Sequence, residues 1–187
     1  NGNIKDHYDK NNRNTHYEYD GSGNVTDIRD AINNHTTYTY EYTYNLPLTK
    51  IDRRLNTTEY EYDTKGNLAK VAAPPPLNYE TKMTYYGNGL LETLTDGRGN
   101  VTSFLYNSNG DLTQRTEPNG RVTTFEYDDG GRLTKTIDPL LNEIVYTYDK
   151  NGNLETVTDP LDRTTTYTYF PNGHVESVTD PEDNSTT

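Results

Sequence analysis

The chain alternates apolar and polar residues over short segments that turn-forming residues separate. In "RTTTYTY", residues 163–169, alternation places Thr165, Tyr167 and Tyr169 on one face of an extended strand. Gly or Pro interrupts such segments roughly every 8–12 residues, and no window has the 3.6-residue period of a helix. The pattern predicts an all-β protein built as a long antiparallel β-meander.

A 21-residue phrase recurs along the chain. "YTYDKNGNLETVTDP", residues 146–160, returns as "YTYFPNGHVESVTDP", residues 167–181. Each copy opens with an aromatic-x-Tyr pair, and an apolar residue follows the turn glycine by two positions. The second tyrosines are Tyr19, Tyr44, Tyr62, Tyr85, Tyr106, Tyr127, Tyr148 and Tyr169. Seven of them have Gly four residues later, at Gly23, Gly66, Gly89, Gly110, Gly131, Gly152 and Gly173.

Internal repeats of this length are typical of repeat architectures, so we expect residues 1–187 to form a single array. A partial repeat at 1–16, with Gly2 in register, precedes eight repeats that begin near residues 17, 42, 60, 83, 104, 125, 146 and 167. The repeat near 42 has no glycine, and its turn "YNLPL", residues 44–48, is expected to be two residues shorter. About eight two-strand repeats predict an open, curved strip of roughly 16 strands.

The turn residues differ at the two ends of each strand pair. Asn-Gly favours a tight hairpin because Gly adopts positive φ easily, so Gly110, Gly131, Gly152 and Gly173 are expected there. Asp-Pro then ends the second strand, since Pro cannot donate to a ladder.

Tyrosine replaces the usual aliphatic core in this composition. Only 29% of residues are hydrophobic, yet there are 18 Tyr against 3 Phe and no Trp. Equivalent tyrosines of successive repeats fall on alternate strands, about 10 Å apart, and form a row. Cross-strand pairs of this kind contribute about 0.2–1 kcal/mol each, so the sheet is expected to gain stability repeat by repeat.

The net charge of -12 argues against nucleic acid, whose phosphates need clustered Lys and Arg. The absence of Cys excludes disulfides, and no apolar run is long enough for membrane insertion. The chain begins with Asn rather than Met, so it is expected to be a piece of a longer protein.

Three turn phrases carry a family resemblance. "YTYDKNGNL", "YEYDTKGNL" and "FEYDDGGRL" resemble the YD repeat of the RHS family, whose phrase is Tyr-Asp, two variable residues, Gly-Arg and Leu. The match recurs in register over nearly the whole chain. Asn often replaces the family's Arg, which only Gly131-Arg132-Leu133 keeps, and "AAPPPLNYE", residues 72–80, lengthens one repeat.

In RHS polymorphic toxins of bacteria, in the B–C component of insecticidal toxin complexes and in teneurins, such repeats build a β-strip that spirals into a hollow shell. The resemblance implies a non-catalytic structural segment of an exported, bacterial protein that is secreted or at the cell surface. Its partners would be an enclosed toxin or other polypeptide and neighbouring repeats of the parent chain. The alternative is a cell-surface recognition or adhesion module that binds carbohydrate or protein.

The spacing of the polar residues argues against a metal site or a catalytic site. "DKNGN", residues 149–153, alternates oxygen ligands as a calcium loop does, but Pro160 stands where the loop needs Glu. The four histidines occupy unrelated repeat positions, and no Gly-x-Ser-x-Gly elbow is present. We therefore expect no catalytic, cofactor or metal residues and no enzyme activity. Rows of tyrosine rings are also compatible with carbohydrate binding, which stays an alternative.

Unpaired strands at the two ends of an open strip are templates for pairing with another chain. Edge-to-edge self-association is therefore expected, and it should strengthen as salt screens the acidic charge.

Overall fold

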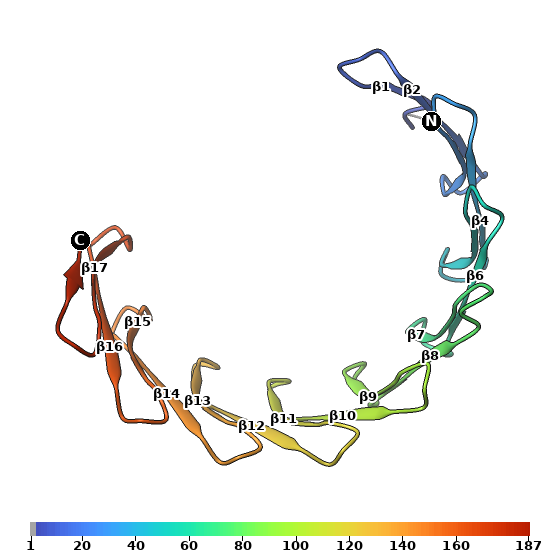
Figure 1. Ribbon diagram of the computed structural model, residues 1–187. Coiled ribbons are helices and arrows are strands. Elements are labelled where there is room, and N and C mark those ends of the chain that lie inside the picture. The colour runs from blue at the N-terminus through green and yellow to red at the C-terminus, as the bar shows by residue number, and fades with distance from the viewer. Residues whose placement is uncertain (1–2) are drawn as a thin grey trace. The chain divides into compact units, whose positions relative to one another are not determined.

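The computed structural model describes residues 3–187, so the expected turn position of Gly2 lies outside the described residues. This part of the chain contains 18 antiparallel β-strands and no helix (Figure 1). The prediction of an all-β antiparallel meander is confirmed, and the two strands beyond the expected sixteen come from incomplete repeats at the ends. Within residues 3–187, no helix is long and apolar enough to cross a membrane.

The chain divides into two compact units, Asn1–Val101 and Thr102–Thr187. The first contains β1 (Asp6–Tyr8), β2 (Asn14–Tyr19), β3 (Val25–Arg29), β4 (His35–Tyr40), β5 (Pro47–Ile51), β6 (Thr57–Tyr62), β7 (Leu68–Ala72), β8 (Glu80–Tyr85) and β9 (Leu91–Thr95). The second contains nearly all of β10 (Val101–Tyr106), and then β11 (Leu112–Thr116), β12 (Val122–Tyr127), β13 (Leu133–Ile137), β14 (Glu143–Tyr148), β15 (Leu154–Thr158), β16 (Thr164–Tyr169), β17 (Val175–Thr179) and β18 (Ser185–Thr186).

Within each unit every strand pairs with its neighbours in the sequence, in two alternating patterns. Strands of one repeat, such as β14 and β15, share four residue pairs and a β-bulge. Strands of successive repeats, such as β13 and β14, share three pairs and then separate. No contact joins β1 to β9 or β11 to β18 among the described residues, so each unit is an open strip. Figure 1 shows the strands of each unit following one another along an arc.

The glycine turns share one hydrogen-bond geometry. Gly152 donates its N–H to the Asp149 carbonyl at 3.0 Å, and Asp149 donates to the Asn153 carbonyl at 2.9 Å. This is a three-residue loop in which a type I turn is followed by a left-handed glycine. The β-bulge of the strand pair lies further from the turn, at the register shift between Thr147 and Tyr148. The φ angles of Gly110, Gly131, Gly152 and Gly173 are 92°, 78°, 88° and 82°. The expected positive φ is thus confirmed, but the residues before these glycines, Asn109, Gly130, Asn151 and Asn172, do not share it.

The second repeat begins earlier than the sequence indicated. Its aromatic strand is β4, which ends at Tyr38 and Tyr40, whereas Tyr42 and Tyr44 lie in the following turn. That turn is one residue longer than the glycine turns, because Glu41 donates its N–H to the carbonyl of Leu46, five residues on. Both the repeat start near 42 and the shortened turn were therefore wrong. The segment "YTYEYTY", residues 38–44, contains two more Tyr than other repeats, so its alternation fits two registers.

Neither face of the sheet is covered. Among the described residues none is buried, so each unit is a single layer without a core. Tyr146 lies opposite Val157 on one face, and Thr147 lies opposite Thr156 on the other, with their hydroxyls 2.7 Å apart. The strip therefore has a tyrosine face and a threonine face, and its stability comes from ladders and cross-strand pairs rather than from a buried interior.

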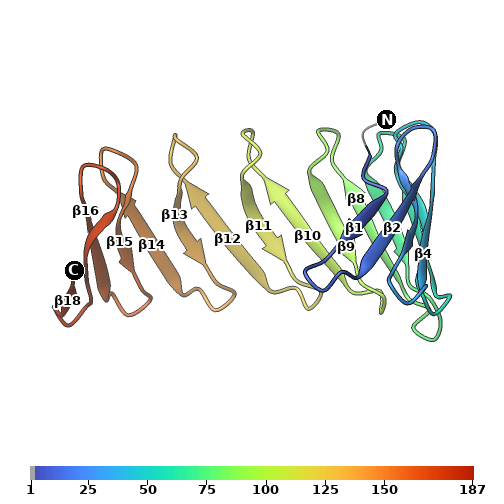
Figure 2. The ribbon, with the colours of Figure 1, turned by 90° about the horizontal axis from the view of Figure 1, so that it is seen from above.

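The two kinds of turn lie at opposite ends of the strands (Figure 2). The turns between repeats use the same hydrogen bonds as the glycine turns, but their left-handed residue varies. It is Asn12 at φ 60° and Asn33 at φ 63°, yet Leu55 at φ 63° and Leu141 at φ 67°. Leucine is strained in this conformation, whereas Asn tolerates it.

Leu55→Asn should therefore stabilise the protein by about 1 kcal/mol, because it relieves backbone strain. Leu55 is 84% exposed, so little packing is lost. Urea unfolding of the variant measures the effect. The control is Leu140→Asn, at an exposed turn position without positive φ, where a change within about 0.5 kcal/mol is expected. Equal effects at both sites would contradict the strain argument.

Candidate functional site

The repeated feature with the most specific geometry is the seam, which we define as the boundary between the second strand of one repeat and the first strand of the next. At the β13–β14 seam the last paired residues are Lys135 and Val145, and beyond them the backbones separate. The Tyr148 hydroxyl spans the gap and donates to the Leu133 carbonyl at 2.8 Å. The phenol thus continues the connection where the backbone ladder stops.

The same hydrogen bond recurs with the acceptor at the apolar position of the preceding repeat. Its donor and acceptor pairs are Tyr19 and Ile4, Tyr40 and Val25, Tyr62 and Pro47, Tyr85 and Leu68, Tyr127 and Leu112, Tyr148 and Leu133, and Tyr169 and Leu154, at 2.7–2.9 Å. Of the other tyrosines named from the sequence, Tyr44 lies in a turn, and Tyr106 ends β10 and lies opposite Leu112 at the bulge. The seam is therefore joined in the same way from repeat to repeat.

The sequence contains the signal for this bond. The first aromatic slot holds Tyr, Phe or Met, but the second is always Tyr, as a position that needs a hydroxyl donor requires. Partial desolvation raises the pKa of Tyr40, Tyr62, Tyr85 and Tyr127 above the ordinary value of a tyrosine. Sequence reasoning placed the tyrosines in a row but missed their bond to the previous repeat.

Tyr148→Phe should reduce stability by about 0.5–1.5 kcal/mol, because the Leu133 carbonyl loses its protein donor. Tyr146→Phe is the matched control in the same strand, since Phe104 and Phe125 already fill the equivalent slot. Its effect should stay within about 0.5 kcal/mol. Chemical denaturation of both variants measures the difference, and equal losses would mean that the hydroxyl bond contributes nothing.

A second recurring feature is an aspartate clamp in the turns. Asp149 Oδ1 accepts the N–H groups of Asn151 and Asn153 at 2.8 and 2.9 Å, and its Oδ2 accepts from the Asn153 side chain at 2.9 Å. Eleven turns of the described chain have this clamp, with Asn or Arg four residues after the aspartate. The aspartates are Asp9, Asp20, Asp30, Asp52, Asp63, Asp96, Asp128, Asp138, Asp149, Asp159 and Asp180.

In each clamp, hydrogen bonds within the turn occupy the carboxylate oxygens that a calcium loop would use as ligands. Hydrogen bonds from the residue four positions on lower the pKa of each clamp carboxyl, so the carboxylates are charged but internally satisfied. Glu41 does the same in the longer second turn, accepting from the N–H groups of Thr43, Tyr44 and Leu46. Sequence reasoning recognised Asp as a turn residue but missed its pairing with Asn or Arg.

Turns also contact their neighbours along the strip. The Arg132 guanidinium lies 4.8 Å from the centre of the Tyr148 ring, one repeat later, which is cation–π geometry. In the second repeat Tyr44 reaches forward, and its hydroxyl donates to the Thr64 carbonyl at 3.2 Å. Side chains of one repeat therefore cover part of the next.

Side-chain contacts to carboxylates cross several seams on the threonine face. Asp6 pairs with His16 and Asp27 with His35, each at 2.9 Å, while Lys135 pairs with Glu143 at 2.9 Å. His16 and His35, two of the four histidines, are thus each in contact with one carboxylate. Across residues 3–187, no group of three or more His, Cys, Asp or Glu side chains is arranged to hold a metal ion.

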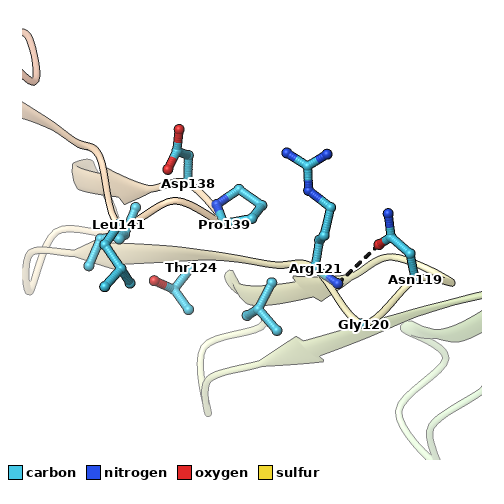
Figure 3. Close-up of a pocket in the computed structure, with 9 residues that line it drawn as sticks. Asn119, Gly120, Arg121, Thr124, Asp138, Pro139 and Leu141 are labelled. Carbon is cyan, nitrogen blue, oxygen red and sulfur yellow. Dashed lines mark hydrogen bonds between the residues drawn. The ribbon is translucent and has the colours of Figure 1, made fainter.

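The surface has shallow pockets between neighbouring turns. One, of ≈ 410 Å³, lies between the turn at 117–121 and the turn at 138–142. Arg121 and Asn119 line one side, and Pro139 and Leu141 line the other (Figure 3).

Comparison with known proteins places the repeats in a family. Residues 106–140 and 148–185 match the model described as RHS Repeat, so these segments are RHS repeats. No curated protein matches the chain.

A solved structure shares the fold at low sequence identity. The crystal structure of TcdB2-TccC3-TEV has a TM-score of 0.64 and 16% identity, covering 89% of this chain and 11% of that one. The Photorhabdus luminescens Tc holotoxin pore is also similar, with a TM-score of 0.46 and 16% identity over 91% of this chain and 13% of that one. The chain therefore spans about a tenth of the length of the first of these.

Proposed function

We propose that this RHS-repeat chain is a structural wall segment of an exported bacterial protein, secreted or held at the cell surface, and that the wall encloses a toxin or other polypeptide. The proposal takes residues 1–187 as one array of YD repeats without catalytic activity. The observation that carries it is the uncovered single layer, in which repeats are joined by ladders and tyrosine hydroxyls rather than by a core. A sheet of this construction can be extended by adding repeats.

The comparisons support this proposal at the level of fold. The similar chain in TcdB2-TccC3-TEV is about eight times as long as this one, since the match covers 89% of this chain and 11% of that one. A wall segment in a longer parent accounts for both the repeat match and the short coverage. Containment would be steric, because the ladders and the tyrosine hydroxyl bonds at the seams leave no opening wide enough for a folded polypeptide to pass.

Protease protection in the longer parent chain tests this function. A polypeptide inside an intact wall should resist proteases that cut it quickly after the wall is unfolded. Gly131→Val with Gly152→Val, which put β-branched residues at positive φ, should open the wall and raise the cleavage rate. Gly21→Val is the control, because its φ is not positive and its Cβ would meet no atom within 4 Å. A parent without any protected segment would exclude containment.

The alternative, a recognition module for carbohydrate or protein, is favoured by the exposed aromatic turn of the second repeat. Tyr42 is 99% exposed and Tyr44 is 50% exposed. Glycan-array binding abolished by Tyr42→Ala but retained by Tyr146→Ala would support this function. The absence of saturable binding to any glycan would remove it.

Self-association through the end strands is a separate proposal. The residues of β1 and β18 are all exposed. Sedimentation at low and high salt tests it, and a monomer under every condition would contradict it.

A further inference from the structure

Five turns of the described chain contain an Asn followed by a Gly. In each of them the Asn is exposed and the Gly has a φ angle between 80° and 92°. The Gly N–H donates to the backbone carbonyl three residues earlier, at 2.9–3.1 Å. The backbones of the five turns are therefore alike, and the turns differ in what holds the Asn side chain. The pairs are Asn88-Gly89, Asn109-Gly110, Asn119-Gly120, Asn151-Gly152 and Asn172-Gly173.

The residue that opens the turn decides how the Asn side chain is held. Asp149 opens the turn of Asn151, and its carboxylate accepts the N–H of the residue four positions on. Asn107 opens the turn of Asn109 and accepts the equivalent N–H at 3.0 Å. The side-chain amides of Asn109 and Asn151 make no hydrogen bond with the residues that the structure describes. In these two turns the clamp residue has taken the N–H that the Asn could have accepted.

Three turns open with a residue other than Asp or Asn, and there the Asn of the Asn-Gly pair accepts that N–H itself. The Oδ1 atom of Asn172 accepts the N–H of His174 at 3.1 Å. The same bond holds Asn119 at 3.1 Å, as the dashed line in Figure 3 shows, and Asn88 at 3.2 Å. The residues that open these turns are Tyr86, Glu117 and Phe170.

This hydrogen bond brings together the two groups that react when an Asn-Gly pair cyclises, which are the Asn Cγ atom and the Gly nitrogen. The bond from Asn172 Oδ1 to the His174 N–H closes a ring that contains the Gly173 nitrogen. It therefore draws Cγ over the nitrogen that attacks it. It also places an N–H at the oxygen that becomes negative in the tetrahedral intermediate, which stabilises that intermediate.

We propose that Asn88, Asn119 and Asn172 are sites of spontaneous deamidation in the folded protein, and that Asn109 and Asn151 react more slowly because their Oδ1 atoms lack this donor. The Gly nitrogen forms a bond to Cγ, the Cγ–Nδ2 bond breaks, and ammonia leaves with the proton of the Gly amide. Water then opens the five-membered imide at either carbonyl, which gives aspartate or isoaspartate. Water is the one further reactant.

Isoaspartate has one more backbone methylene than Asn, so its formation lengthens the turn. In the turn of Asn172, Phe170 donates its N–H to the His174 carbonyl and Gly173 donates to the Phe170 carbonyl, both at 2.9 Å. Both bonds close over a backbone of normal length, so the inserted methylene weakens them. Each event also adds one negative charge to a chain whose net charge is already -12.

Peptide mapping of the 187-residue chain after incubation in mildly alkaline buffer measures conversion at each Asn. Each rate is divided by the rate at the same Asn in urea, which removes the effect of the neighbouring sequence. The ratio should be about two- to tenfold larger for Asn172 than for Asn151, as expected for one hydrogen bond in the transition state. Asn88 and Asn119 should behave as Asn172 does, and Asn109 as Asn151 does. Equal ratios, or no conversion of Asn172 in the folded chain, would overturn the proposal.

Phe170→Asp tests the hydrogen bond itself, because the new carboxylate should take the His174 N–H away from Asn172. Asp180 forms such a clamp with Pro in the next position, as this variant would have. The ratio for Asn172 should fall to that of Asn151. Phe170→Ala is the matched control, since it removes the same ring without adding an acceptor, and its ratio should not change. An equal decrease in both variants, with both folded by circular dichroism, would refute the proposal.

Asp149→Ala tests the opposite direction in the neighbouring repeat. Without the clamp carboxylate the N–H of Asn153 is available to Asn151, so the ratio for Asn151 should rise about two- to tenfold. Asn109, whose turn is unaltered, is the internal control and should keep its ratio. An unchanged ratio for Asn151, in a variant that is folded by circular dichroism, would show that the clamp does not control the reaction.

Discussion

Gly97→Ala should destabilise the protein by about 1–3 kcal/mol, as expected for overpacking. A Cβ built at Gly97 lies 2.6 Å from Cδ2 of Tyr79, and it also overlaps the Cβ and Cγ of that side chain. These inner atoms cannot move away by a simple rotation, so the turn at 73–79 must shift. Thermal and urea unfolding measure the loss.

Gly21→Ala is the matched control for this substitution. Gly21 also follows the aspartate of a clamped turn, but its Cβ would meet no atom within 4 Å. Alanine there should be neutral or stabilise by about 0.4–1 kcal/mol, because it restricts the unfolded chain. In a Tyr79→Ala background Gly97→Ala should lose its cost. Equal effects of Gly97→Ala with and without Tyr79 would show that the clash is not the cause.

Acid should unfold the protein cooperatively as the clamp aspartates are protonated. Hydrogen bonds from the residue four positions on are a principal cause that lowers the pKa of these eleven carboxyls. A lowered folded-state pKa contributes stability that is present above the unfolded value of about 3.9 and is lost as pH falls through the folded values. The urea midpoint should therefore be constant from about pH 7 to pH 5 and fall steeply below about pH 4.

Opposing this effect, acid also neutralises the net charge of -12 and so reduces self-repulsion. A rise in stability between about pH 5 and pH 3 would mean that repulsion outweighs the clamps. The double variant Asp149→Asn with Asn153→Asp provides a local control, because Asn107 and Asp111 already form this reversed pair. It should fold at neutral pH with little loss of stability.

The sequence determined the repeat and its local geometry because each depends on residues close together in the chain. The turn glycines needed positive φ, and Gly152 has it, since a left-handed turn residue excludes most side chains. Alternation of Tyr and Thr fixed which residues share a face, as in the pair of Tyr146 with Val157. The register failed in the second repeat, where Tyr38, Tyr40, Tyr42 and Tyr44 continue the alternation and only the Glu41 turn decides where the strand ends.

Only the tertiary structure decided how repeats are joined. The bond from Tyr148 to the Leu133 carbonyl depends on the two strands separating after three residue pairs, which no local pattern specifies. The contact of Tyr79 with Gly97 likewise joins two successive turns whose distance is set by strand pairing. Local chemistry thus fixed each hairpin from the sequence, whereas contacts between hairpins required the spacing of paired strands in the folded sheet.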